Sequence, residues 1–352
     1  MKNEINLNGK IIRKESKDFY FIAEIGTNYV EIAEKEHADE FIIAASMITR
    51  AYDAGANAVK FQIYEPEGVA DQDKASSQFE YLKKHSLLSY EDYDSLMKKC
   101  EIIGIDFIAT LFTERAIEYF ASKLKILKVA SPDITNKPML QKLGKYNKPI
   151  ILSTAGSTLY EVEKALEWIG HEQVAILHCT ANYPTKPEDA NLSAIRTLND
   201  YFSNVIGYSD HLNPESILNS PLYAFLLGAN IIEKHFTIYR FLEGNDHLHS
   251  FTPTSLTANI ARLKEAQTLM GNPQKRPTES EADFVLMGRR SIAINKEMEK
   301  GETITANDLI FLRPGTGIHP YNTDIIIGKK TARKIDKNAI IVYNTDIDEK
   351  DI

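Results

Sequence analysis

The chain has 352 residues, 43% of them hydrophobic and 26% charged, which is typical of a globular protein with room for one large and one small domain. A net charge of −8, without a basic stretch interleaved with aromatic residues, argues against nucleic-acid binding, and two cysteines are too few for a disulfide framework or a thiolate zinc site. With no apolar window near about 18 residues and no signal-peptide core, we expect a cytoplasmic protein that makes no use of a membrane.

Between residues 19 and 272, short apolar, β-branched runs alternate with stretches of helical periodicity. We predict eight strands, over residues 20–25, 58–63, 107–110, 126–130, 149–153, 174–178, 205–209 and 230–235. Predicted helices between them include 39–54, 90–103, 113–122, 158–169, 191–202 and 253–269. Eight βα repeats over about 250 residues match a TIM (β/α)8 barrel, so we predict an α/β fold with this barrel as the catalytic domain over residues 1–272.

Polar residues interrupt the predicted strands mostly near their C-terminal ends. They are Glu24, Lys60, Gln62, Thr110, Lys128, Ser131, Ser153, Ser209, His211 and His235. A single polar residue at a strand end is ordinary loop chemistry. Ten of them on the same side of a barrel predict one ring of functional side chains, because the C-terminal ends of all eight strands open onto the same face.

The chain changes character after the predicted barrel. Residues 273–288 include two prolines and are polar as far as Asp283, which predicts a linker. Residues 289–352 consist of short alternating runs joined by turn-rich loops, which predicts a small β-rich domain of about 65 residues.

Two histidines are the strongest candidates for metal ligands. His211 and His235 each end a strand-like run and lie 24 residues apart, about one βα unit. Imidazoles at the mouths of adjacent parallel strands can hold one divalent metal ion beside a substrate. The alternative for either residue alone is a hydrogen-bonded histidine at a strand end. His37, His85, His171 and His249 lie in polar stretches, and we expect them to be solvated.

The ordered set of motifs resembles the sialic acid synthase family, whose members make N-acetylneuraminic, legionaminic and pseudaminic acids. The motifs are Ala23–Gly26, Lys60–Gln62, Lys128–Ser131, Ile150–Thr154, Cys179–Pro184 with Pro187–Asp189, Gly207–His211, Glu233–Thr237, Asp246–His247 and Arg289–Ser291. The resemblance covers nearly the whole chain, and the small domain is similar to the family's antifreeze-protein-like (SAF) domain.

The resemblance implies a synthase that condenses phosphoenolpyruvate with an open-chain N-acylmannosamine-type aldehyde and releases phosphate by C–O cleavage. It implies a divalent metal ion, Mn²⁺ or Mg²⁺, on His211 and His235, and binding of phosphoenolpyruvate by Thr110, Lys128, Ser131, Ser153 and Ser209. It further implies catalytic roles for Glu24, Lys60, Asp133 and Asp246, and sugar binding by Gln62, Tyr183, Asp246 and Arg313. A buried structural lysine is the alternative for Lys60 or Lys128.

In the family, the arginine that matches Arg313 reaches the substrate in the partner subunit, which implies a domain-swapped homodimer; a solvated turn arginine is the alternative. The chain departs from the family at three points: Asp133 replaces a glutamate, Ala181 replaces Asn or Ser, and Ala155-Gly156 replaces Gly-Met. These departures leave the acylated sugar undetermined.

Two other functions stay open at this stage. One is a metal-dependent pyruvate aldolase on the same barrel, or one that forms a Schiff base through Lys128, and neither would release phosphate. The other is a sugar-binding barrel without activity. The C-terminal domain argues against a simple aldolase, and the histidine pair and the lysines argue against an inactive barrel.

Overall fold

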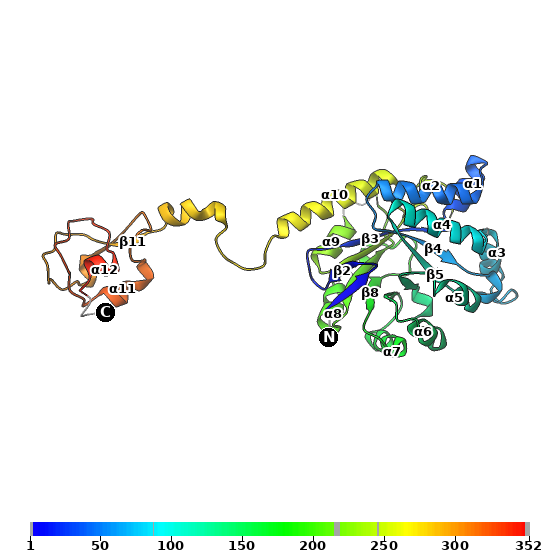
Figure 1. Ribbon diagram of the computed structural model, residues 1–352, viewed down its shortest axis with the longest axis horizontal. Helices are drawn as coiled ribbons and strands as arrows, with labels where there is room; N and C mark the ends of the chain where they lie inside the picture. The colour runs from blue at the N-terminus through cyan, green and yellow to red at the C-terminus, as the bar shows by residue number, and fades with distance from the viewer. Residues whose placement is uncertain (1–2, 87, 215–218, 245, 349–352) are drawn as a thin grey trace. The chain divides into compact units, whose positions relative to one another are not determined.

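The computed structural model describes residues 3–86, 88–214, 219–244 and 246–348. The chain forms two compact units, Met1–Gly271 and Asn272–Ile352, each of which is described by itself (Figure 1). Within the described ranges, no helix has both the length and the apolar character needed to cross a membrane.

The first unit is a closed barrel of eight parallel strands, as the sequence predicts. The strands follow one another around the barrel in chain order, and β10 closes it by pairing with β3. They are β3 (Tyr20–Gly26), β4 (Ala58–Ile63), β5 (Asp106–Leu111), β6 (Leu127–Val129), β7 (Ile150–Ser153), β8 (Val174–Cys179), β9 (Val205–Asp210) and β10 (Ile231–His235). The TIM-barrel prediction is therefore confirmed.

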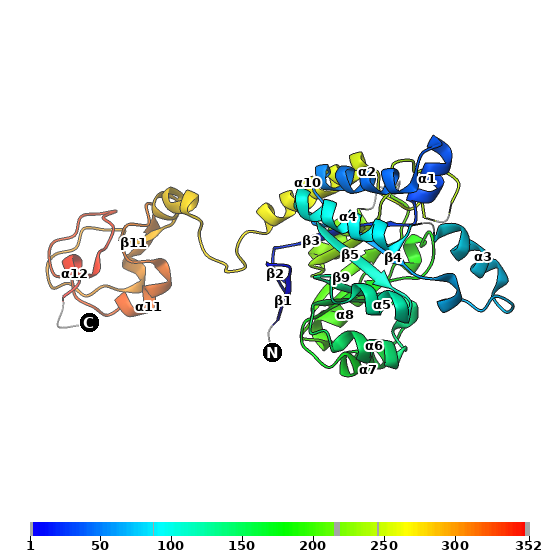
Figure 2. The ribbon, with the colours of Figure 1, turned by 45° about the vertical axis from the view of Figure 1, so that its right-hand side comes forward.

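Helices cover the outside of this barrel (Figures 1 and 2). They are α1 (Tyr29–Glu36), α2 (Glu40–Asp53), α3 (Ser76–His85), α4 (Tyr90–Ile103), α5 (Glu114–Phe120), α6 (Lys137–Gly144), α7 (Leu159–Ile169), α8 (Ala194–Tyr201), α9 (Ser220–Leu226) and α10 (Pro253–Met270). Local sequence sets several of their starts: Ser89 and Thr158 begin α4 and α7 with capping boxes, each pairing a hydroxyl with an acidic residue three positions on.

Alternation along the strands decides which side chains reach the barrel interior. Residues such as Ile22, Ile108 and Ile151 form one buried cluster inside the barrel, whereas their strand neighbours pack against the helices in another. A hairpin of β1 (Glu4–Leu7) and β2 (Lys10–Arg13) adds its apolar side chains to the interior cluster. Aliphatic residues thus fill the lower barrel, and the inward positions near the C-terminal strand ends are left for polar residues.

The second unit is small and β-rich. Its strands β11 (Ser291–Ile294) and β12 (Leu309–Leu312) pair antiparallel, and isolated bridges such as Met298–Ile335 extend the pairing. It also contains the short α-helices α11 (Thr323–Ile326) and α12 (Tyr343–Asp346) and further helical turns, the longest over Phe284–Gly288. Its core is mostly isoleucine, contributed by residues 292, 294, 304, 318, 326, 335, 341 and 347, together with Met298.

Candidate active site

The mouth of the barrel carries a buried network of opposite charges. Lys60 on β4 and Lys128 on β6 are only 5% and 3% exposed. Lys60 Nζ lies 2.8 Å from Glu24 Oε2 and 3.7 Å from Glu233 Oε1. Glu233 Oε2 lies 4.0 Å from Lys128 Nζ, so this one carboxylate bridges both ammonium groups. Gln62 Nε2 donates to Glu24 Oε1 at 2.9 Å, which orients the second carboxylate.

Hydroxyl groups surround these charges. Lys128 Nζ donates to Ser153 Oγ at 2.6 Å, and Ser209 Oγ donates to the bridging carboxylate at 3.1 Å. Ser131 Oγ, just after β6, accepts a hydrogen bond of 3.0 Å from the backbone N–H of Ala155, just after β7. Thr110 Oγ1 is buried and makes no hydrogen bond to any described residue. Hydroxyls beside lysines suit an anion with several oxygens, because they donate without adding charge.

Burial shifts the protonation of this network. Desolvation lowers the pKa of Lys128 and raises the pKa of Glu24. Burial alone would also raise the pKa of Glu233, but Lys128 and Lys60 outweigh it and lower that pKa. The same carboxylates raise the pKa of Lys60 against the effect of its burial. Charges held in so dry a pocket gain strongly from an incoming ion of opposite sign, because little solvent screens them.

Imidazoles and a carboxylate form a second cluster. One ligand atom each from His235, Asp246 and His249 lies within 4.8 Å of the others. The Asp246 carboxylate is 3.7 Å from His235 Nδ1 and 3.7 Å from His249 Nε2. The His211 ring is centred 5.5 Å from the His235 ring and 4.3 Å from the ring of Tyr183. Side chains from two strand ends and two loops therefore converge on one point.

This cluster has the properties of a metal site. His235 Nδ1 and both ring nitrogens of His249 are buried without a hydrogen bond to any described residue, an arrangement that costs free energy unless a ligand satisfies them. Desolvation and the neighbouring imidazoles lower the pKa of His235 well below its ordinary value and that of His249 to about 3. Both rings are therefore neutral at pH 7, the form that binds metals. Several imidazole nitrogens with one carboxylate suit a divalent transition metal ion, whereas Mg²⁺ prefers oxygen ligands.

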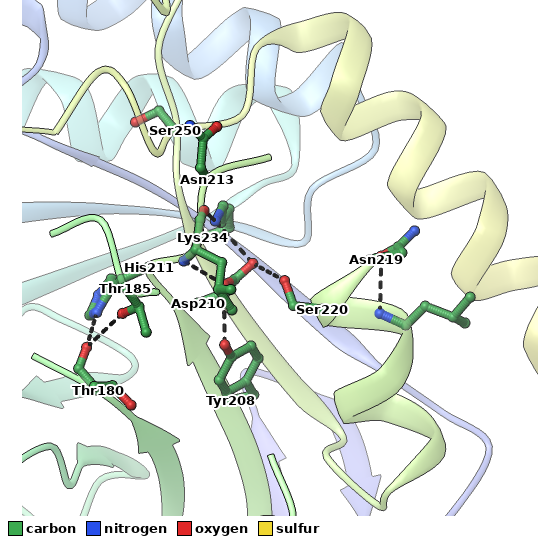
Figure 3. Close-up of polar contacts among 12 residues, drawn as sticks. Thr180, Thr185, Tyr208, Asp210, His211, Asn213, Asn219, Ser220, Lys234 and Ser250 are labelled. Atoms are coloured by element: carbon green, nitrogen blue, oxygen red, sulfur yellow. Dashed lines mark hydrogen bonds and ion pairs between the residues drawn. The ribbon is translucent and has the colours of Figure 1, made fainter. Parts of the chain in front are cut away.

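His211 is oriented for the same role. Its Nδ1 lies 2.7 Å from the carbonyl oxygen of Thr180, and Figure 3 shows the ring turned toward that residue. A carbonyl oxygen only accepts, so we assign the proton to Nδ1, which leaves a free lone pair on Nε2.

A buried ion pair fixes the two strand ends that carry His211 and His235. Lys234 Nζ lies 2.9 Å from Asp210 Oδ2, and both side chains are at most 1% exposed (Figure 3). Tyr208 and Ser220 donate to the same carboxylate at 3.2 and 2.8 Å. Asp210 and Lys234 are register partners on β9 and β10, so the pair ties these strand ends together.

Metal binding at this site should depend on pH through Asp246. Burial, together with the nearby Glu24 and Glu31 carboxylates, raises its pKa to about 7. A ligand carboxylate must be ionised, so below about pH 7 the metal ion displaces a proton. We expect the Kd for Mn²⁺, titrated into metal-free protein by calorimetry, to rise about tenfold per pH unit between about pH 6.5 and 5.5 and to be flat above about pH 8. Asp246→Asn should bind more weakly without this slope; an unchanged slope in that variant would assign the proton elsewhere.

The remaining predicted residues lie in different surroundings. Asp133 ends a short 3₁₀ turn after β6, is half-buried, and accepts a hydrogen bond from Asn136 at 3.2 Å; burial raises its pKa. Tyr183 is 53% exposed, yet its ring stands over the imidazole cluster. Arg313 belongs to the second unit, where it is exposed.

The sequence did not lead us to Glu233 or His249 as site residues, and it gave a wrong expectation for His85, which lies outside the site. Glu233 shares the inward face of β10 with His235, and the two-residue period of a strand was a sufficient signal for it. The expectation that His249 and His85 are solvated is wrong, because they are 0% and 3% exposed. His249 lies in the loop between β10 and α10, and His85 ends α3, so only tertiary packing buries these two rings. His37 is exposed, as expected.

Comparisons with known proteins identify the family of this chain. Residues 47–275 match the model of the NeuB family, and residues 289–345 match the SAF domain. The N,N'-diacetyllegionaminic acid synthase of Legionella pneumophila is 33% identical over 97% of this chain and 99% of its own length. A pseudaminic acid synthase of Campylobacter jejuni is 28% identical over 91% of this chain and 94% of its own.

A solved structure of a sialic acid synthetase has the same fold. The N-acetylneuraminic acid synthetase of Leptospira borgpetersenii, crystallised with citrate, superimposes with a TM-score of 0.72 at 31% identity. The match covers 81% of this chain and 96% of that protein.

Proposed function

The chain belongs to the NeuB family and is a phosphoenolpyruvate-dependent nonulosonic acid synthase, and from this premise we propose that it condenses phosphoenolpyruvate with an open-chain N-acylmannosamine-type aldehyde. The observation that carries the proposal is the pairing of two buried ammonium groups, Lys60 and Lys128, with a nitrogen-rich metal site in the same barrel mouth. The first set suits the phosphate and carboxylate of one substrate, and the second suits the aldehyde oxygen of the other.

The two lysines bind phosphoenolpyruvate while keeping their protein partners. Lys128 donates to Ser153 and to the Val129 carbonyl, which leaves one of its three N–H donors for the substrate. Lys60 retains its ion pair with Glu24 and has donors to spare. Thr110 and Ser131 add hydroxyl donors to the phosphate. This arrangement orients C3 of phosphoenolpyruvate and stabilises charge that develops on its oxygens.

The rest of the reaction follows from the carboxylates. C3 of phosphoenolpyruvate attacks the aldehyde carbon, and positive charge develops at C2. Glu24, oriented by Gln62, or Asp133 takes a proton from the water that adds at C2. The C–O bond of the tetrahedral intermediate then breaks and phosphate leaves. A divalent metal ion held by His211 and His235, with Asp246 and His249 beside them, would polarise the aldehyde oxygen when bound.

An isotope experiment tests this function against the aldolase. Phosphoenolpyruvate labelled with ¹⁸O in its bridging C–O–P oxygen is incubated with Mn²⁺ and a panel of N-acylated aldoses, and the products are weighed by mass spectrometry. C–O cleavage places the label in phosphate. Label retained in the nine-carbon product would show P–O cleavage and contradict the proposed step. Turnover of pyruvate without phosphate would support an aldolase, and binding without turnover of any sugar would support a sugar-binding barrel.

The order of the panel follows the relatives. The precursor of N,N'-diacetyllegionaminic acid comes first, because the synthase of L. pneumophila is similar along almost the whole chain. N-acetylmannosamine, its 6-phosphate and the pseudaminic acid precursor follow. The departures from the family at Asp133, Ala181 and Ala155-Gly156 weaken the assignment of the sugar more than that of the reaction type. The buried free thiols of Cys100 and Cys179 fit a cytoplasmic enzyme.

We further propose a domain-swapped homodimer in which Arg313 contacts the sugar in the partner subunit's barrel. Two facts support it: Arg313 is exposed, and an apolar patch of Phe284, Leu286 and Met287, on the helical turn Phe284–Gly288, lies beside the arginine turn. These side chains are 67%, 48% and 58% exposed, and Gly315 N donates to the Leu286 carbonyl at 2.7 Å. An apolar patch of this kind is typical of an interface.

Complementation between two impaired variants tests the dimer. Arg313→Ala and His235→Ala are each expected to be nearly inactive alone. After subunit exchange, half of the dimers are mixed and each has one intact site, so about a quarter of wild-type activity should return. The absence of recovery, with exchange verified by mass, would show that Arg313 serves its own barrel or no site.

A further inference from the structure

A third buried polar cluster lies outside the groups that face the substrates. Glu31 on α1 accepts a hydrogen bond from His85 Nε2, at the end of α3, at 2.6 Å. Its other oxygen lies 3.6 Å from His247 Nε2, and His247 Nδ1 is bonded to Thr237 Oγ1 at 2.7 Å. We refer to Glu31, His85, His247 and Thr237 as the clamp. All four are at most 9% exposed, although they come from three separate segments of the chain.

The clamp ends in the loop that supplies the metal site. His247 lies between Asp246 and His249 in the sequence, and its side chain points to Glu31 while theirs face His235. We propose that Glu31 is a positioning residue that holds this loop through His247, so that Asp246 and His249 face His235. The inference rests on the proposed function, because it concerns the metal site of that reaction.

The contacts support a holding role for Glu31. Burial alone would raise its pKa, but His247 and His85 lower it to about 2, so the carboxylate is charged at neutral pH. The 3.6 Å contact is longer than a hydrogen bond, yet His247 Nε2 makes no hydrogen bond to any other described residue, which leaves Glu31 as its polar partner. A buried charge without its partners is costly, so the carboxylate draws both imidazoles toward α1.

Gly244, in the loop, packs closely against His247 and Glu31 of the clamp. A Cβ atom added to Gly244 would lie 2.8 Å from His247 Cδ2 and 3.2 Å from Glu31 Cδ. Asn28, which precedes α1, donates to Ser250 Oγ at 3.2 Å and adds a second tie between the same helix and loop. Glu31 therefore sits where any loosening of α1 against the loop is transmitted to Asp246 and His249.

The chain offers a matched control. Glu34 lies one turn further along α1 and pairs with Lys84 of α3 at 3.2 Å, so it joins the same two helices, which lie near each other in Figures 1 and 2. Its side chain is 53% exposed, and among the described residues it forms no ion pair with the loop. Glu34→Gln removes the same charge from the same helix and leaves the clamp intact.

The test measures Mn²⁺ affinity by calorimetry and backbone hydrogen exchange in metal-free, full-length protein for the wild type, Glu31→Gln, Glu31→Ala, Gly244→Ala and Glu34→Gln. We expect Glu31→Ala and Gly244→Ala to raise the Kd about 10- to 100-fold, as loss of outer support does at other metal sites, and Glu31→Gln to raise it less. Exchange should quicken over residues 239–250. The KM for the sugar should rise with the Kd while the KM for phosphoenolpyruvate stays constant. Glu34→Gln should match the wild type in every measurement.

Each contrary result has a distinct meaning. A folded Glu31→Ala protein with wild-type affinity and exchange would overturn the proposal, as would an equal effect of Glu34→Gln. If Glu31→Ala fails to fold, Glu31→Gln decides by the same criteria, because it keeps the size of the side chain and removes the charge that faces His85 and His247. If the wild type binds no Mn²⁺, the metal site of the proposed function fails, and loop exchange alone then confirms or refutes the clamp.

Discussion

Replacing His235 with alanine is expected to abolish turnover and metal binding together. His235 ends β10, stands 3.7 Å from Asp246, and has a ring centred 4.8 Å from that of His249. A bound metal ion contributes several kcal/mol to stabilising charge on a carbonyl oxygen, so kcat/KM should fall at least about a thousandfold. Metal content after dialysis, measured by plasma mass spectrometry, should drop to background, and Mn²⁺ in excess should not restore the rate.

The fold should survive this change. His235 Nδ1 has no hydrogen bond to lose among the described residues, and a strand-end substitution at the barrel mouth leaves the aliphatic interior intact. Circular dichroism and the melting temperature of the metal-free variant should therefore stay near the wild type. His37→Ala, at an exposed position, is the matched control. A His235→Ala protein that retains metal and turnover would transfer the metal site to other residues.

The barrel could be predicted from the sequence because its strands are short, β-branched and separated by regular helices. Each predicted strand agrees with the observed one to within about two residues, which is the usual uncertainty of a boundary. The hairpin of β1 and β2 was overlooked, although Asn8-Gly9 between two alternating runs is a strong hairpin signal. Both turn residues have positive φ, as such a turn requires.

The candidate site could be predicted only where its residues sit on strands. Lys60, Lys128 and His235 could be predicted because inward-facing residues at the C-terminal strand ends of a TIM barrel all reach the same active-site face. Asp210 and Lys234 carried a signal as well, since opposite charges at paired positions of adjacent strands attract. Thr237, His247 and His249 had no such signal, because the long loop between β10 and α10 places them and no periodicity describes that loop. Glu31 and His85 lie on helices, but their contact depends on how α1 and α3 pack.

Replacing Lys128 with methionine should remove most of the binding of phosphoenolpyruvate in the transition state. The ammonium group is 3% exposed and donates to Ser153 and to the Val129 carbonyl. Methionine keeps the length and the apolar stem but loses the charge. Loss of a charge-assisted contact in a dry site costs about 3 to 5 kcal/mol, so kcat/KM for phosphoenolpyruvate should fall by about two to four orders of magnitude, measured as phosphate release.

The neighbouring carboxylate makes this prediction specific. Glu233 pairs with both lysines, so the methionine variant leaves a negative charge facing the anionic substrate with only Lys60 to balance it. Adding Glu233→Gln to Lys128→Met should therefore recover part of the lost phosphoenolpyruvate affinity, because it removes the unbalanced charge. Lys148→Met is the control: Lys148 precedes β7 at the far end of the barrel and donates to backbone carbonyls of Ala121 and Ser122, so its loss should lower stability and leave KM unchanged. Trapping of Lys128 by borohydride in the presence of pyruvate would instead identify a Schiff base, and the lysine would then be a nucleophile and not an anion-binding group.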